Sequence, residues 1–258
     1  MKKIFPYLIV VIVLSLSYPT KAQNIYLKLQ GEYDYGLSQK RSHYLNPIPG
    51  MLQDEIAPYT YGNGTNFGLS AGYIFSDKIS LELSIFYHLS QKFEFEQLDI
   101  THYARTYNIN PSVVISPGNE GFNPYARIGL VFGLGKIISE KNEDDFYSKE
   151  ELTGGLGIGF NTALGAEYGI TDKFKLFAEL KAQSLSLAPE KAEYVVYEQN
   201  GIDYLPNMTT SQKEVDFVEE YDQEYGMDDD DPDEPETRLK YNYSFSNIGI
   251  NIGLKISF

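Results

Sequence analysis

The sequence of 258 residues predicts an all-β fold, a closed antiparallel up-and-down transmembrane β-barrel of eight strands, or ten if a long connection supplies another hairpin. Three observations predict it: eight segments alternate apolar and polar residues, no long apolar run follows residue 22, and short turns alternate with long connections. Only helices and closed barrels satisfy every backbone hydrogen-bonding group inside a bilayer. Alternating segments without an apolar helical span therefore favour a barrel.

Residues 1–22 are expected to form a signal peptide that precedes the fold. A basic pair near the start, an apolar run over 5–16 and a small-x-small sequence ending at Ala22 follow the order of a secretory signal. Cleavage before Gln23 would leave 23–258 as the barrel domain. A retained helical anchor is the alternative, although the apolar run is shorter than the roughly 20 residues that a helical span needs.

The eight alternating segments have the length of tilted membrane strands, about 9–11 residues or a few more. Successive side chains of a strand point to opposite faces, so each segment has an apolar face for lipid and a polar or glycine face for the interior. Pro111 predicts a bulge in the fourth strand, and a change of apolar parity predicts another near Ser246. The predicted strands lie at 25–35, 66–75, 79–90, 106–115, 126–135, 156–170, 174–183 and 247–258.

The connections between these strands differ in length at the two ends of the barrel. Short periplasmic turns and long extracellular loops are typical of outer-membrane barrels. The last connection is predicted to be a long acidic extracellular loop, since 214–236 holds 13 acidic residues and no Lys or Arg, and Asn200-Gly201 predicts a hairpin within it. The short turns lie at 76–78, 116–121 and 171–173, and the long connections at about 36–65, 91–102, 137–153 and 187–240.

Charged residues of both signs occupy the polar faces and are expected to pair inside the lumen. The apolar faces hold a single basic residue, Arg105 near a strand end, and a basic side chain facing lipid at mid-bilayer costs roughly 2–4 kcal/mol. Buried charges need partners. A soluble β-sandwich or lipocalin-like barrel, the alternative fold, needs no such balance. The predicted lumen residues are Lys28, Arg127, Lys175, Lys181 and Lys255 with Glu32, Asp34, Glu82, Glu167 and Glu179.

The last predicted strand carries the most specific motif. Asn251, Gly253, Ile256 and Phe258 follow the order polar, any, Gly, two free positions, hydrophobic, free, aromatic. In this motif the chain resembles the small outer-membrane β-barrel proteins, the porin-like group around outer-membrane protein A. The resemblance implies insertion into the outer membrane of a Gram-negative bacterium by the barrel assembly machinery, in contact with membrane lipid and lipopolysaccharide. It names an architecture and no activity.

The expected function is a structural or surface-interaction role of the extracellular loops, without catalysis or a cofactor, and with an extracellular protein or glycan as the candidate ligand. A net charge of −15 disfavours nucleic acid, which needs a basic surface. A narrow porin-like channel is an alternative, although eight strands leave an interior that side chains can fill.

Two further candidate sites follow from short motifs. His88 and Ser90 share a strand face, and such a pair is similar to the catalytic pair of outer-membrane lipid A deacylases, so a lipid hydrolase is the weaker alternative. The acidic run 228–234 offers oxygen ligands for Ca²⁺ but lacks the alternate spacing of a calcium loop. It therefore predicts a solvated loop that binds cations only loosely, and no metal site is predicted.

Overall fold

The computed structural model describes most of the chain beyond the predicted signal peptide. Residues 1–22 and Gln23 lie outside the described residues, as do five of the acidic residues of the last connection, Asp222, Glu224, Asp228, Asp229 and Asp230. Within the described part, no helix has both the length and the apolar character to span a membrane. The described residues are 24–37, 39–40, 58–95, 99–119, 121–220 and 231–258.

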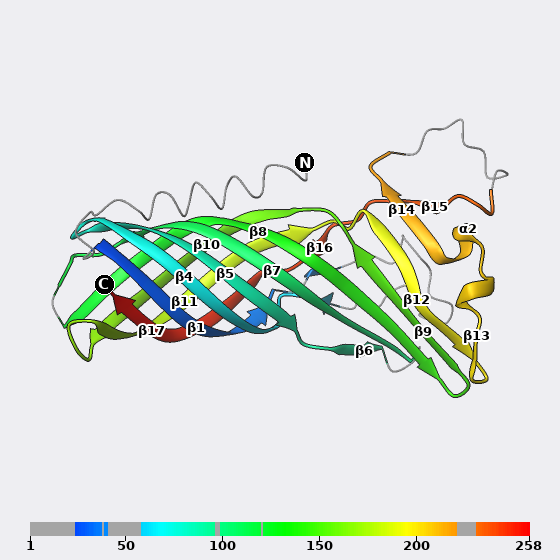
Figure 1. Cartoon of the computed structure of the whole chain (residues 1–258), viewed down its shortest axis with the longest axis horizontal. Coiled ribbons are helices and arrows are strands. Elements are labelled where there is room, and N and C mark those ends of the chain that lie inside the picture. Colours follow the sequence, from blue (N-terminus) through cyan, green and yellow to red (C-terminus); the bar gives the residue numbers. More distant parts are fainter. Residues whose placement is uncertain (1–23, 38, 41–57, 96–98, 120, 221–230) are drawn as a thin grey trace.

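Eight antiparallel strands form a closed ring, which confirms the predicted barrel (Figure 1). The ring closes where the first strand pairs with the last, from Tyr26 opposite Ser257 to Gly36 opposite Asn247. Outward side chains such as Leu29 and Phe160 are exposed, as expected of a lipid-facing wall. In ring order the strands are β1 (Ile25–Gly36), β4 (Gly64–Ser76), β5 (Ile79–Ser90), β7 (Ile100–Ile115), β8 (Phe122–Glu143), β10 (Gly157–Gly169), β11 (Phe174–Leu187) and β17 (Asn247–Ser257).

Both predicted bulges are wrong. Strands β7 and β8 keep one register across Pro111, because the missing N–H of proline removes a ladder bond without inserting a residue. Near Ser246 the register with β11 is also unchanged, between the short strand β16 (Tyr243–Ser244) and β17. Between these two strands the backbone N–H of Phe245 donates to Leu185 at 2.8 Å, and the ring of Phe245 packs into a buried cluster.

Two connections that were predicted to be loops contain strands: 137–153 is mostly strand, and the described part of 187–240 includes four strands. Strand β8 pairs with β10 as far as Gly133 and with β9 from Ile137 onward. Beyond the barrel rim, the edge of β8 that paired with β10 therefore pairs with β9. The resulting sheet, here called the distal sheet, continues β7 and β8 beyond one end of the barrel, at the right of Figure 1. Its added strands are β9 (Phe146–Thr153), β12 (Lys191–Gln199), β13 (Ile202–Asp203), β14 (Glu214–Val218) and β15 (Glu236–Leu239).

The hairpin predicted at Asn200-Gly201 is present, and both residues adopt the positive φ that a tight hairpin turn requires. Its second strand is short, however, and β12 makes most of its ladder with β9. The remaining elements are small: β2 (Gln39–Lys40), β3 (Pro58–Tyr59), β6 (Phe93–Phe95), the 3₁₀-helix η3 (Leu205–Asn207) and α2 (Thr210–Lys213).

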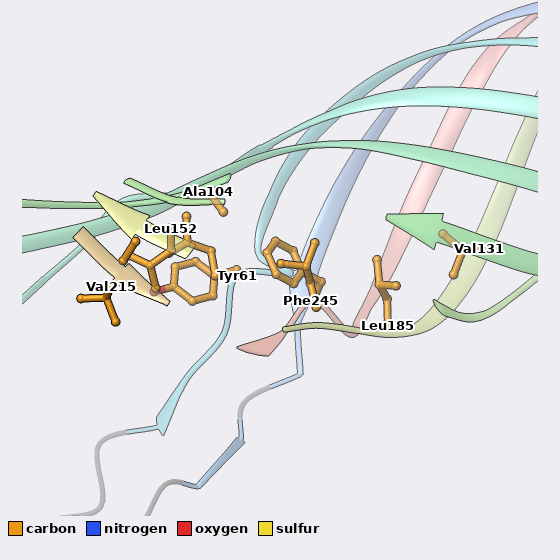
Figure 2. Close-up of a cluster of buried hydrophobic side chains, with 10 residues drawn as sticks. Tyr61, Ala104, Val131, Leu152, Leu185, Val215 and Phe245 are labelled. Carbon is orange, nitrogen blue, oxygen red and sulfur yellow. The ribbon is translucent and has the colours of Figure 1, made fainter. Parts of the chain in front are cut away.

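A cluster of buried apolar side chains, here called the mouth cluster, lies where the barrel meets the distal sheet. Figure 2 shows a row that runs from Val215 and Leu152 of the distal sheet, through Tyr61 and Phe245, to side chains of the barrel wall. The cluster thereby joins the two sheets with one apolar core. Its buried members are Tyr61, Ala104, Val131, Ile137, Leu152, Leu185, Leu187, Ala192, Val215 and Phe245.

Candidate functional site: the barrel interior and the distal sheet

Four charged side chains form the middle layer of the lumen: Lys28, Glu82, Arg127 and Glu179. The guanidinium of Arg127 donates to Glu179 at 2.7 Å, and the ammonium of Lys28 lies 2.8 Å from a carboxylate oxygen of Glu82. Each cation also lies 3.9 Å from the other carboxylate, so the four form one neutral group. Their side chains are at most 1% exposed. At such burial a charge is tolerated only when it is paired.

Nearer the mouth lies a second group, here called the mouth layer, formed by Glu32, Asp34, Asn66, His88 and Lys181. The ammonium of Lys181 binds a carboxylate oxygen of Glu32 and lies 3.0 Å from Asp34. The amide nitrogen of Asn66 donates to both carboxylates, at 3.0 Å and 2.6 Å. The layer therefore gathers two acids from β1 around one ammonium from β11.

A third group lies near the short turns. The ammonium of Lys255 donates to both carboxylate oxygens of Glu167, at 2.8 Å and 3.0 Å, and sits over the ring of Tyr26. Lys175 lies 3.9 Å from Glu167, and its side chain is 31% exposed because it stands at the rim. The structure thus places every lumen residue predicted from the sequence on the inner face, in three layers.

Bulky side chains fill the space between these layers. Tyr26 donates to Glu82 at 2.9 Å, Tyr125 donates to Glu179 at 2.8 Å, and Lys28 lies 4.7 Å from the ring centre of Phe177. These side chains occupy the interior around the middle layer, and the mouth cluster lies above them. The sequence did not predict that Asn66 and Tyr125 donate hydrogen bonds to the lumen carboxylates. Both residues nevertheless lie on the same strand faces as the predicted lumen residues.

His88 and Ser90 do not form a catalytic pair in the described structure. The two ring nitrogens of His88 face the side-chain oxygen of Asn66 at 2.8 Å and the backbone oxygen of Tyr61 at 2.7 Å. The hydroxyl of Ser90 accepts from the backbone N–H of Ala104 at 2.6 Å. A hydrolase needs a base free to take the proton of its nucleophile, and here both groups bond elsewhere.

The residues of the C-terminal motif divide between interior and exterior. The amide of Asn251 donates to Glu179 at 2.8 Å, which ties the last strand to the middle layer. Ile256 and Phe258 belong to the outward face, and the N–H of Phe258 donates to Ile25 at 3.0 Å. Asn251 therefore has a packing role that is separate from any role in assembly.

Replacing Gly253 by Ala is expected to destabilise the barrel by about 1–3 kcal/mol, the usual cost of overpacking. A β-carbon there would lie 2.3 Å from the backbone oxygen of Leu29 and 2.7 Å from the ring of Phe177. Gly31→Ala is the matched control, because the nearest atom to its β-carbon would be 4.0 Å away. Urea unfolding in lipid vesicles measures both variants. Equal unfolding midpoints would contradict this account of Gly253.

One face of the distal sheet carries an aromatic stripe, here defined as Phe146, Tyr194 and Tyr197. The ring centroids of Phe146 and Tyr197 are 5.2 Å apart, and those of Tyr194 and Tyr197 are 5.7 Å apart. Beside the stripe, burial raises the pKa of the Glu150 carboxyl, which Arg238 opposes. The rings come together because a bulge in β12 between Tyr194 and Val196 places Tyr197 on the same face as Tyr194. No local pattern in the sequence indicates this bulge.

The described residues offer no metal centre, since they contain no group of three or more His, Asp or Glu side chains that could hold an ion. The acidic run predicted to bind cations loosely begins with Asp228, outside the described residues. Of its other members, Asp231 accepts from the backbone N–H of Asp233 at 2.9 Å, as in a solvated turn.

Three solved structures are similar to this chain at low sequence identity. OprG of Pseudomonas aeruginosa has 15% identity and a TM-score of 0.53, with 92% of this chain and 97% of that chain covered. A major outer membrane protein from Thermus thermophilus has 9% identity and a TM-score of 0.49, covering 91% and 99%. Neisserial surface protein A has 12% identity and a TM-score of 0.44, covering 91% and 97%.

Sequence comparison identifies the family. No curated protein matches the chain. A family model described as outer membrane protein beta-barrel domain matches residues 9–188, more than half of the sequence. Together with the closed ring of eight strands, this match shows that the chain belongs to the outer membrane protein β-barrel domain family and resides in the outer membrane.

Proposed function

We propose that this protein is a non-conducting, non-enzymatic barrel that holds the distal sheet on the outer side of the membrane, where the aromatic stripe binds an extracellular protein or glycan. The observation that carries the proposal is the common register of β7 and β8 from the ring into the distal sheet, from Ile115 opposite Ala126 to Ile100 opposite Lys141. A ladder of this kind couples the sheet rigidly to its anchor.

The composition of the stripe supports a contact role. Tyrosine offers a large contact area at low cost in conformational entropy, and aromatic residues and arginine are enriched where binding energy concentrates. Phe146, Tyr194 and Tyr197 are partly exposed, and Tyr194 interacts electrostatically with Arg238. A stripe on a rigid sheet is ordered before it binds, which lowers the entropy lost on association.

The charge of the distal segments limits which kinds of partner can bind there. Residues 138–155 and 188–240 contain 23 of the 36 acidic residues of the chain and only 6 Lys or Arg. Like charges across an interface oppose association. A neutral or basic partner fits this surface better than a strongly anionic one, and loosely bound divalent cations would bridge it to lipopolysaccharide.

A binding experiment tests the proposal. The full-length protein in nanodiscs is applied to arrays of neutral glycans and extracellular proteins, beside a variant with Phe146, Tyr194 and Tyr197 each replaced by Ser. Loss of the stripe is expected to weaken binding by at least about thirtyfold, since a single hot-spot residue contributes about 2 kcal/mol or more. The matched control replaces Tyr147 and Val196, on the opposite face, by Ser and keeps its affinity. Absence of binding by the native protein, or equal binding by the stripe variant, would contradict the proposal.

A further inference from the structure

His88 stands between the mouth layer and the mouth cluster with an oxygen atom against each ring nitrogen. One is the backbone oxygen of Tyr61, which can only accept a hydrogen bond. The other is the side-chain oxygen of Asn66, whose orientation is set because its amide nitrogen donates to Glu32 and Asp34. Both ring nitrogens must therefore donate, and only the imidazolium form of histidine has two N–H groups.

The charges around His88 point to the same form. Two carboxylates from β1, Glu32 and Asp34, face the single ammonium of Lys181 from β11. The neighbours of His88 on β4 and β7, Asn66 and Thr106, are uncharged. One additional proton makes this buried group neutral, whereas an uncompensated buried charge is strongly unfavourable.

The position of that proton follows from the available acceptors. Among the described residues, one oxygen of Glu32 and one of Asp34 have no hydrogen-bond partner. The remaining oxygens of both groups receive N–H donors from Lys181 and Asn66. Each ring nitrogen of His88 has an oxygen acceptor within 2.8 Å, so both N–H groups of an imidazolium would be satisfied.

We propose that His88 is a charged latch: as an imidazolium it ties the backbone of Tyr61 to Asn66, and through Asn66 to the carboxylates of the mouth layer, and loss of its proton releases the mouth cluster. Tyr61 is central to that cluster. Its ring stacks on Phe245 at 5.6 Å and contacts Phe93 at 5.3 Å, and its N–H donates to Ser244 at 2.9 Å. A neutral His88 retains one N–H, so one of its two oxygen contacts becomes repulsive.

Nuclear magnetic resonance of the ¹⁵N-histidine-labelled full-length protein in nanodiscs tests the protonation. Both ring nitrogens of His88 are expected to carry protons at neutral pH, and raising the pH is expected to remove one of these two protons. Assignment uses His88→Gln, with His102→Gln as the matched control. A neutral His88 accompanied by the infrared carbonyl band of a protonated Glu32 or Asp34 would overturn the proposal, even if the His88 variant fails to fold.

Amide hydrogen exchange of the native protein tests the latch itself. Release of His88 is expected to speed exchange at Tyr61 and Phe245 by about tenfold beyond the intrinsic pH effect, as for the loss of one charge-assisted hydrogen bond. The amides of Gly169 and Ser257, at the turn end, serve as internal references. Unchanged protection at Tyr61 and Phe245 while His88 titrates would show that the imidazolium does not stabilise the mouth cluster, and would overturn the proposal.

Discussion

Replacing Glu179 by Gln is expected to lower the free energy of unfolding by about 3–5 kcal/mol, the usual cost of removing one partner of a buried ion pair. The carboxylate of Glu179 accepts from Arg127 at 2.7 Å, Tyr125 at 2.8 Å and Asn251 at 2.8 Å. Glutamine keeps the shape but removes the charge. Arg127 and Lys28 would then share the single carboxylate of Glu82.

Urea unfolding in lipid vesicles, followed by heat-modifiable gel mobility, measures this effect. Glu193→Gln is the matched control, because Glu193 is exposed on the distal sheet. Its unfolding midpoint should match that of the native protein. A change below about 1 kcal/mol for Glu179→Gln, the size expected for a surface ion pair, would show that the middle layer is solvated rather than packed.

Replacing Phe245 by Ala is expected to cost about 3–5 kcal/mol, as for other buried phenylalanines. Its side chain is 2% exposed and fills the mouth cluster between Tyr61 and the barrel wall. Because the cluster joins the distal sheet to the barrel, the expected loss is local: faster amide exchange in β12 and β14, with the ring of eight strands intact.

Hydrogen exchange followed by mass spectrometry separates these two regions. Ile202→Ala, an exposed apolar residue of the distal sheet, is the control and should leave exchange in β12 and β14 unchanged. If Phe245→Ala lowers the protection of β1 and β17 as much as that of β12, the mouth cluster is part of the barrel core and does not couple two separate sheets.

The ring could be predicted from the sequence because its signal is local. Side chains alternate with a period of two, so a lipid-facing apolar residue fixes the inward direction of its neighbours along the whole strand. Lys28 and Arg127 are assigned to the lumen on this basis. The acidic partner of each of these two residues depends on the stagger between strands. It therefore cannot be predicted from the sequence of a single strand.

The distal sheet could not be predicted because its pairing is non-local. Strand β8 changes its pairing partner between Gly133 and Ile137, and the sequence of those residues does not indicate that β9 is the new partner. The mixed polarity of 146–151 is typical of a loop as well as of a strand with one solvated face. Tyr61 and Phe245 are single aromatic residues in connections, and their shared burial appears only in the folded chain.

Planar-bilayer conductance of the refolded native protein tests the central claim most directly, that ion-paired side chains and the mouth cluster close this barrel. An open porin inserted in the same membrane provides the positive control, and heat-modifiable mobility shows that the protein is folded. Traces at the leak level of the bare bilayer are expected, because Arg127, Lys28, Tyr26 and Phe86 fill an interior that eight strands leave narrow. Stable unitary conductance of the folded native protein would contradict the claim.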